Sequence, residues 1–504
     1  MAEYPNFKHG TRGEVIADGI PAAGVGRTKQ AIVYIGTAPV HLVEGGASNV
    51  NKPIVISDMA EARKYLGYSE NWADYTLCEP MHVHFDLKGI GPLVFINVLD
   101  PARHRTLVGG TATLTPDNGR VKIVDAEDAI IDTITVTGVE SGDEFVKGTD
   151  YNVSYDFGKK VITIYEVTAG SLGTDALAIA WAKIDPSAVT EADVIGSTDT
   201  YGLNTGVYAI KNVYNATGYI PSYLLAPGFS SVPAIHNALY QNSQTIAGHW
   251  NAWMFVDMPV VDGTGTAITL ATAPTWKVSN NYNRDNESVF FPLAKGKDGK
   301  IYHISVLNAA NFQQLLIQNS GIPYMTGSNT ACDIIEDLYF TEAVAGRVYS
   351  DDIINRCLNA NGINSAAYVG GRWAIWGMFA GSYNQEDATS INVNDTCLMM
   401  LYYLTNDFQH RRNVNVDKPM PINTLKSIVA EEQSRVDALL GIGALTYGKV
   451  LLDGTKEARA DVYQGDFRIL FKVTNTPLAK SLTAISNWTP DGFEVYFAAM
   501  DEMA

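Results

Sequence analysis

The segment 13–39 constrains, more than any other, what this chain can fold into. It begins as a polar stretch interrupted by glycine and proline, and at Gln30 it becomes a compact apolar strand, Ala31–Ile35. The polar stretch leaves no room for a helix, yet it carries three β-branched residues: Val15, Ile16 and Ile20. Such a segment is either a disordered leader or a strand that pairs with the sheet of another molecule.

Size and charge narrow the class of protein. A chain of 504 residues is too long for one hydrophobic core, so several domains are expected. Its 36 Lys+Arg against 54 Asp+Glu give a net charge of −18, whereas nucleic-acid-binding proteins normally present a basic face. We therefore expect no nucleic acid among its partners.

Cysteine spacing and hydropathy indicate the redox state of the protein and its relation to membranes. The four cysteines are far apart and form no CxxC pair, so we expect reduced, buried thiols rather than disulfides or a zinc site: Cys78, Cys332, Cys357 and Cys397. The start, Met1–Pro5, lacks the pattern of a signal peptide, and the longest apolar run, Pro92–Leu99, is too short to span a bilayer. We expect a soluble protein without direct membrane insertion.

Residues 29–108 are typical of an α/β layer. Asp58, with Glu61 three residues later, is placed to cap a helix over Met59–Leu66, and a second helical segment covers Asp74–Leu87 apart from Pro80. Three strands accompany these helices: Ala31–Ile35, Ile54–Ile56 and Leu93–Leu99.

Over residues 109–185 the spacing of apolar residues changes to the alternation that is typical of β-strands. The turn Asp156–Lys159 is a hairpin signal. Six alternating or β-branched segments predict an inserted β-sandwich: Thr111–Leu114, Val121–Val124, Ile130–Val136, Tyr151–Tyr155, Val161–Tyr165 and Ala176–Ala182.

Strands and helices alternate again over residues 186–344, which favours an α/β middle domain. The predicted strands are Leu224–Ala226, Ala252–Val256, Ser288–Phe291 and Tyr302–Val306. The predicted helices are Val232–Ala247 and Ala309–Gln318.

Residues 345–487 and 488–504 complete the chain. The pattern predicts helices over Asp351–Asn361, Asn394–Gln409 and Ile422–Leu440, with a strand pair around Ala366–Phe379. The end is predicted as four strands, so that both termini are extended: Gly448–Leu452, Asp466–Val473, Leu482–Ile485 and Phe493–Phe497.

Candidate chemical sites are weak. Gly24–Lys29 lacks the spacing of a phosphate loop and precedes a strand, so no nucleotide or other cofactor is expected. His82 and His84 lack further ligands at suitable spacing except Asp86, which favours a structural role over a metal site.

Serines and carboxylates give no better catalytic candidate. Ser230 and Ser382 lie near glycines but lack the GxSxG context. Three carboxylate pairs fall on predicted helices and are better explained as solvated faces: Asp351-Asp352, Glu431-Glu432 and Glu336-Asp337. We expect no catalytic residue and no metal, and hence a protein that is not an enzyme.

One compact basic cluster, His410-Arg411-Arg412, follows a predicted helix. It either complements the helix dipole or contacts an acidic partner. Together with two extended ends, this profile is typical of an assembly subunit, because strand addition satisfies an exposed sheet edge and gives affinity through main-chain hydrogen bonds.

The chain resembles the contractile tail sheath proteins of bacteriophages and phage-tail-like bacteriocins, in particular those of the Gram-positive type. Most of the chain carries the resemblance, in the order expected for that family. The matching segments are Lys29–Pro39, Asn51–Ile56, Gly148–Val153, Asp185–Gly196, Ala226–Phe229, Asp257–Pro259, Leu358–Asn364, Trp376-Gly377 and Arg411-Arg412.

The resemblance implies a multidomain α+β or α/β fold. An inner domain would form from the N- and C-terminal parts, 29–108 and 345–487, with residues 109–185 and 186–344 inserted and facing outward. Terminal arms, 1–28 and 488–504, would be donated to neighbours' sheets in stacked hexameric rings. The implied arm residues are Val15, Ile16, Ile20, Gly24, Gly26, Phe493, Val495 and Phe497.

The resemblance also implies partners and a mechanism. Contraction of a metastable lattice would drive a tail tube through a target envelope, and the tube, baseplate and tail terminator proteins would be partners. The tube-facing candidates are Arg411, Arg412, Lys426 and Arg435. Assembly would occur in the bacterial host cytoplasm, and the product would be a virion tail or a released particle. The alternatives are a surface β-protein such as an adhesin and a metal-dependent hydrolase.

Overall fold

The computed structural model describes residues 29–341, 348–387, 391–455, 459 and 462–504. The chain divides into two compact units, Met1–Glu431 and Glu432–Ala504, and each is described by itself. Helix α10 (Ile422–Gly441) begins in the first unit and ends in the second.

An eight-stranded mixed sheet organises the first unit. Its six central strands are parallel, and the strand at each edge is antiparallel to its neighbour. In spatial order the strands are β18 (Arg372–Trp376), β17 (Ile363–Val369), β13 (Glu287–Phe290), β12 (Trp253–Asp257), β11 (Ile220–Leu225), β1 (Gln30–Gly36), β3 (Leu93–Asn97) and β2 (Pro53–Ile56).

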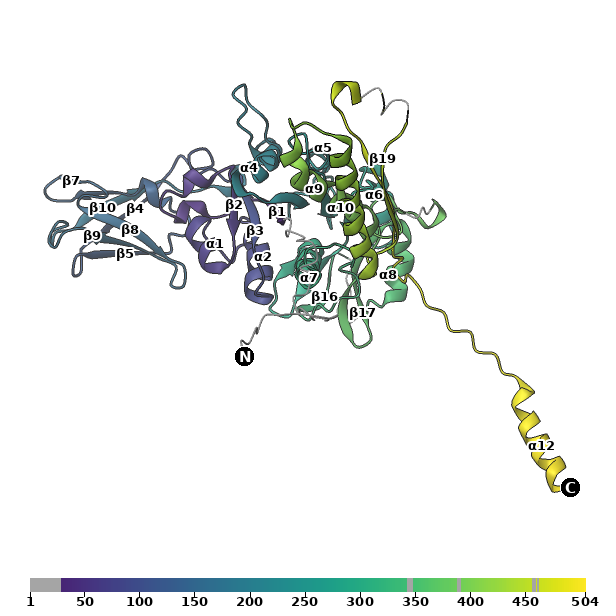
Figure 1. The fold of residues 1–504 in the computed structure, drawn as a ribbon. Coiled ribbons are helices and arrows are strands. Elements are labelled where there is room, and N and C mark those ends of the chain that lie inside the picture. The colour runs from purple at the N-terminus through teal and green to yellow at the C-terminus, as the bar shows by residue number, and fades with distance from the viewer. Residues whose placement is uncertain (1–28, 342–347, 388–390, 456–458, 460–461) are drawn as a thin grey trace, which may run out of the picture. The chain divides into compact units, whose positions relative to one another are not determined.

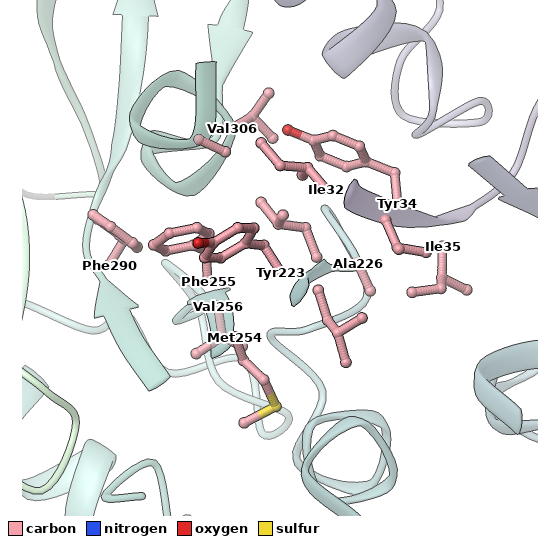
Figure 2. Packing of buried hydrophobic residues seen from close by; sticks show 14 of the residues in the cluster. Ile32, Tyr34, Ile35, Tyr223, Ala226, Met254, Phe255, Val256, Phe290 and Val306 are labelled. Carbon is pink, nitrogen blue, oxygen red and sulfur yellow. The ribbon is translucent and has the colours of Figure 1, made fainter. Parts of the chain in front are cut away.

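The central strands are continuous apolar runs because both faces of the sheet are covered. β11, β12 and β13 are buried at every position, and β1 is buried at every position after Gln30. Tyr34 pairs with Leu225 on one side and Phe95 on the other, and its ring stacks on that of Phe95 with centroids 5.7 Å apart. Figure 2 shows side chains of β1, β11, β12 and β13 meeting in this core.

Helices of the first unit pack against this sheet (Figure 1); among them, α7 contacts β12 and β13, α5 contacts β12, and α9 contacts β11. The helices are α1 (Met59–Tyr65), α2 (Cys78–Met81), α3 (Glu191–Ile195), α4 (Val213–Thr217), α5 (Pro233–Gln241), α6 (Ala273–Ser279), α7 (Ile304–Gln318), α8 (Asp351–Cys357) and α9 (Thr396–Arg412). A small sheet adds β14 (Leu293–Gly296), β15 (Ile301–Tyr302) and β16 (Ile335–Tyr339).

The predicted cap of α1 is confirmed. The Asp58 carboxylate accepts a hydrogen bond from the backbone N–H of Glu61, and the Glu61 carboxylate accepts one from the N–H of Ser57. The segment Asp74–Leu87 is less regular than predicted: α2 begins only at Cys78, holds Pro80 in its first turn, and continues as a π-helical turn over His82–Leu87.

The β-rich region forms two sheets around its own core, as expected for a sandwich. Figure 1 shows its strands gathered in one group. One sheet contains β4 (Gly110–Leu114), β10 (Leu177–Trp181), β6 (Thr135–Gly138) and β7 (Glu144–Phe145). The other contains β5 (Arg120–Val124), β9 (Val161–Glu166) and β8 (Tyr151–Asp156).

The expected division between an inner and a middle domain requires correction. Strands from 29–108, 186–344 and 345–487 lie in one sheet, so β11, β12 and β13 of residues 186–344 share a sheet with β1–β3. β1 finds its partners in β3 and β11 rather than in the C-terminal strands. The physical reason is that β1 is apolar on both faces and can be buried only in the middle of a covered sheet.

The predicted strand Tyr302–Val306 is also wrong. Only Ile301–Tyr302 is extended, and α7 begins at Ile304. A short apolar run fits a buried helix as well as a buried strand, and here the first ten residues of α7 are all buried.

The second unit holds the end of α10, the hairpin strands β19 (Leu445–Leu452) and β20 (Ile469–Asn475), and α12 (Glu494–Met503). Two predicted strands are absent: Leu482–Ile485 has no regular secondary structure, and Phe493–Phe497 is helical. Phe493 ends the 3-10 turn Pro490–Phe493, and Val495 and Phe497 lie in α12. The C-terminal arm therefore ends as a helix.

Candidate assembly interface

β19 and β20 form an antiparallel sheet that contains only these two strands in the described part of the chain. Pairing runs from Leu452 opposite Ile469 to Leu445 opposite Asn475, with an irregularity between Leu445 and Tyr447. A two-stranded sheet is marginal by itself in water and is stabilised when further strands or a helix cover it.

The C-terminal half of α10 supplies that cover on the β19 side. The Gln433 side chain donates to the carbonyl of Gly448 at 3.3 Å and accepts from the N–H of Val450 at 2.8 Å. A Cβ at Gly448 would lie 2.1 Å from Cγ1 of Val436, so only glycine permits this approach of helix to strand. Gln433 and Gly448 were not recognised from the sequence, because a single Gln on a helix and a single Gly in a strand carry no distinctive pattern.

Beyond β20 the chain leaves large apolar side chains in solvent. Residues 477–489 have no regular secondary structure, and Leu482, Ile485 and Trp488 are 90%, 83% and 80% exposed. The predicted arm residues in and beside α12 are exposed as well: Phe493, Val495 and Phe497. The other predicted arm residues lie outside the described residues: Val15, Ile16, Ile20, Gly24 and Gly26.

The predicted basic cluster is largely paired within the chain. Arg411 donates to Asp407 at 2.8 Å, and Arg412 donates to Glu431 at 2.8 Å, with arginine side chains only 15% and 17% exposed. Lys426 is exposed on α10, and Arg435 is half-buried in the second unit. Of the four tube-facing candidates, Lys426 thus offers its charge to solvent most openly.

The two histidines considered as metal ligands have separate partners. His84 is fully buried: its Nδ1 donates to Gln313 at 2.6 Å and its Nε2 accepts from the Tyr34 hydroxyl at 2.7 Å. Burial lowers the pKa of His84 to about 4, so this imidazole is neutral. His82 instead lies 3.2 Å from Asp86. The described residues contain no group of three His, Cys, Asp or Glu side chains that could hold a metal ion.

The other chemical candidates have ordinary structural positions. Ser230 is buried and its hydroxyl accepts from the N–H of Asp257 at 3.2 Å. Glu336 and Asp337 lie in strand β16, not on a helix as predicted, and Glu336 pairs with Lys295 at 2.8 Å. Within the described ranges, no helix is both long and apolar enough to cross a membrane.

Comparison with known proteins finds a relative that matches nearly the whole chain. No family model matches this sequence. The tail sheath protein of Burkholderia phage BcepMu is 25% identical over 497 residues, covering 95% of this chain and 96% of that protein. The chain is a tail sheath protein.

Two solved structures share the fold of this sheath protein. The contracted helical sheath of the anti-feeding prophage aligns with a TM-score of 0.53 at 10% identity, covering 97% of this chain and 100% of that one. The sheath tail protein of Desulfitobacterium hafniense aligns with a TM-score of 0.50 at 11% identity, covering 94% and 100%. The sheath protein is thus a structural component of a phage tail or phage-tail-like particle, not an enzyme.

Proposed function

We propose that this sheath protein polymerises as stacked hexameric rings around a tail tube, with its terminal arms donated to the sheets of neighbouring copies. The two-stranded sheet β19–β20 carries this proposal. An incoming strand would complete its main-chain hydrogen bonds and cover apolar side chains that a lone hairpin exposes, such as Leu470 on β20.

The edge that receives the arm is β20. Gln433 already occupies the backbone groups of Gly448 and Val450 on β19, and an added strand would have to displace it. The arm that is donated is residues 477–489, whose exposed Leu482, Ile485 and Trp488 become buried on the neighbour. Residues 1–28 form the second arm.

Contraction follows from this linkage. The extended lattice is metastable, and subunits rotate nearly as rigid bodies while the donated strands keep neighbours connected. The large buried core of the first unit suits it to such motion. Contraction drives the tube through a target envelope, using energy stored in subunit contacts at assembly. The tube, baseplate and terminator proteins are the partners, and assembly occurs in the host cytoplasm.

Deletion of each arm tests the proposal. Removing residues 1–28, or truncating after Thr476, is expected to leave a chain with the circular dichroism and melting transition of the full protein. Neither truncated chain should form tubes in negative-stain microscopy, whereas the full chain should. Tubes from either truncated chain would show that the removed end does not link subunits, and loss of folding would show that the end belongs to the subunit's own core.

A further inference from the structure

A hollow of about 200 Å³ lies at the start of β1 in the first unit. Its apolar lining comprises Ile32, Pro92, Tyr219, Tyr223, Leu316 and Ile317. Cofactors and drug-sized ligands occupy about 300–1,000 Å³, whereas an apolar cavity of about 150 Å³ accommodates benzene. The hollow therefore fits one aromatic side chain rather than a cofactor.

The polar groups around the hollow already have partners. Gln30 donates to the carbonyl of Gly321 at 3.1 Å and accepts from the Tyr223 hydroxyl at 3.2 Å. Gln313 donates to the carbonyl of Pro92 at 3.0 Å. Since these donors and acceptors are engaged, the occupant that gains most is apolar.

Helix α12 presents an apolar stripe with aromatic side chains. Phe493, Tyr496, Phe497, Met500 and Met503 recur at helical spacing and are 46% to 80% exposed. A helix of ten residues is marginal alone in water, so it needs a surface on which to pack. Glu494 and Asp501 lie three residues before and four residues after Phe497 and so flank the stripe, while Glu502 lies on the opposite side.

The charge of the C-terminal segment indicates which kind of surface α12 would bind. No Lys or Arg follows Lys480, and the last turns are acidic, which disfavours an anionic membrane or a nucleic acid. The hollow has the complementary character: it is apolar, and its charged lining residue is Lys29, which is exposed. The extended residues 477–489, which join β20 to the turn before α12, can span about 45 Å.

We propose that α12 of one copy docks on the hollow at the base of β1 in a second copy, with the Phe497 ring inserted and Lys29 facing Glu494 and Asp501, the acidic residues beside Phe497. This inference rests on the proposed self-assembly and adds a second contact to the donated arm. Strand addition holds residues 477–489, and the docked helix prevents that strand from sliding out when the arm is pulled.

Cross-linking between two different chains tests the contact. One chain carries Met500→Cys, in the same stripe as the retained Phe497, and the other Ile317→Cys, on the rim of the hollow, so a disulfide between positions 500 and 317 joins two copies by design. Mixed under assembly conditions and oxidised, these chains should give a cross-linked dimer whose linked peptides are identified by mass spectrometry. The matched control, Val495→Cys, lies on the opposite side of α12 and should give at least about tenfold less product.

Other results would overturn the proposal. These are equal cross-linking from positions 495 and 500, no cross-link, or a dilute double variant that closes the disulfide within one chain equally fast. Phe497→Asp should also abolish or shorten tubes, whereas Ala498→Asp, at an exposed position outside the apolar stripe, should not. Normal tubes from Phe497→Asp would refute the docking while leaving strand donation intact; absence of tubes from the unmodified chain would instead refute the proposed assembly.

Discussion

Glu79 and His303 are joined by two contacts across 224 residues of sequence. The Glu79 carboxylate accepts from the backbone N–H of His303 at 2.6 Å, and its other oxygen lies 2.6 Å from the imidazole Nδ1. Glu79 lies in α2 and His303 directly precedes α7, so this pair fastens the N-terminal layer to the helix that packs on β12 and β13.

The Glu79–His303 pair should make stability depend on pH in the alkaline range. Burial lowers the pKa of His303, but the charges of Glu79 and Asp257 outweigh it and raise the pKa from 6.5 to about 9. A raised pKa gives stabilisation that is complete below about pH 6.5 and is lost as pH rises through 9. Glu79→Gln should therefore cost on the order of 2–3 kcal/mol at pH 6 and clearly less at pH 10, measured by denaturant unfolding.

The control for this pH dependence is Glu336→Gln, which removes an exposed ion pair with Lys295. Exposed pairs contribute little, so its unfolding curve should stay near that of the unmodified chain at both pH values. A Glu79→Gln penalty that does not change between pH 6 and pH 10 would contradict a charged His303.

Asp395 should make the stability of the chain depend on pH in the neutral range. Its carboxyl is 4% exposed and accepts from the Thr326 hydroxyl at 3.0 Å, and burial raises its pKa from 3.8 to about 7. The stabilisation that goes with the protonated Asp395 carboxyl is complete below about pH 3.8 and is lost as pH rises through 7. Asp395→Asn should stabilise the chain by about 2 kcal/mol at pH 8 and lose this advantage by pH 4.

Denaturant unfolding at pH 4 and pH 8 measures this effect. Asp352→Asn serves as control because the Asp352 side chain is 69% exposed and pairs with Arg356 within the same helix. Parallel pH profiles for the Asp395→Asn variant and the unmodified chain would exclude a buried carboxyl that titrates near neutrality.

Gly448 should be needed for the hairpin that receives an arm. Gly448→Ala forces Cβ into Val436 and should cost about 1–3 kcal/mol, seen as faster amide hydrogen exchange in β19 and β20. Gly454→Ala is the matched control, because a Cβ there meets nothing within 4 Å. Equal exchange in the two variants would show that α10 does not need close approach to β19.

Local signals in the sequence predicted much of this fold. Asp58 marked the start of α1, and the apolar run after Gln30 marked β1, because capping and burial act over a few residues. The order of strands in the main sheet could not be predicted, since β1 joins β11 across almost two hundred residues and periodicity says nothing about such pairing.

The C-terminal end shows where local reasoning fails. Phe493–Phe497 contains Val, Tyr and Phe, which favour strands, but its aromatic residues also belong to an apolar stripe along one side of α12. Exposure of the predicted arm residues in and beside α12 agrees with a contact outside the subunit, whereas their secondary structure does not agree with strand donation. The pairing of Arg412 with Glu431 was equally hidden, because Glu431 lies on another helix, whereas Asp407 stands four residues before Arg411 in α9 and that spacing does indicate a pair.

The β-sandwich should be removable as a unit. Its entry and exit lie side by side: the Thr106 N–H donates to the Lys183 carbonyl, and the Asp185 N–H donates to the His104 carbonyl, both at 2.9 Å. Replacing residues 107–182 by a short Gly-rich turn should leave a cooperatively folding chain that melts a few degrees lower.

The pKa of His41 provides a readout for the removal of the sandwich. Its Nε2 contacts the carbonyl of Glu127 in the sandwich at 2.8 Å, and burial lowers its pKa to about 4. Without the sandwich, the pKa of His41 should rise toward 6.5 in an NMR titration. A shortened chain that aggregates, or that keeps the low pKa, would show that the sandwich is not an independent insert.

Charge-reversal variants should show which of the basic residues stabilise the subunit and which contact the tube. Arg411→Glu places a second carboxylate beside Asp407, which is only 6% exposed, and should cost about 3–5 kcal/mol of subunit stability. Lys426→Glu changes an exposed side chain on α10 and should leave unfolding within about 0.5 kcal/mol of the unmodified chain. If α10 faces the tube, Lys426→Glu should weaken assembly on added tubes in a sedimentation assay, whereas Lys418→Glu, exposed just before α10, should not. Unchanged tube-templated assembly of Lys426→Glu would remove this helix as the tube-contacting surface.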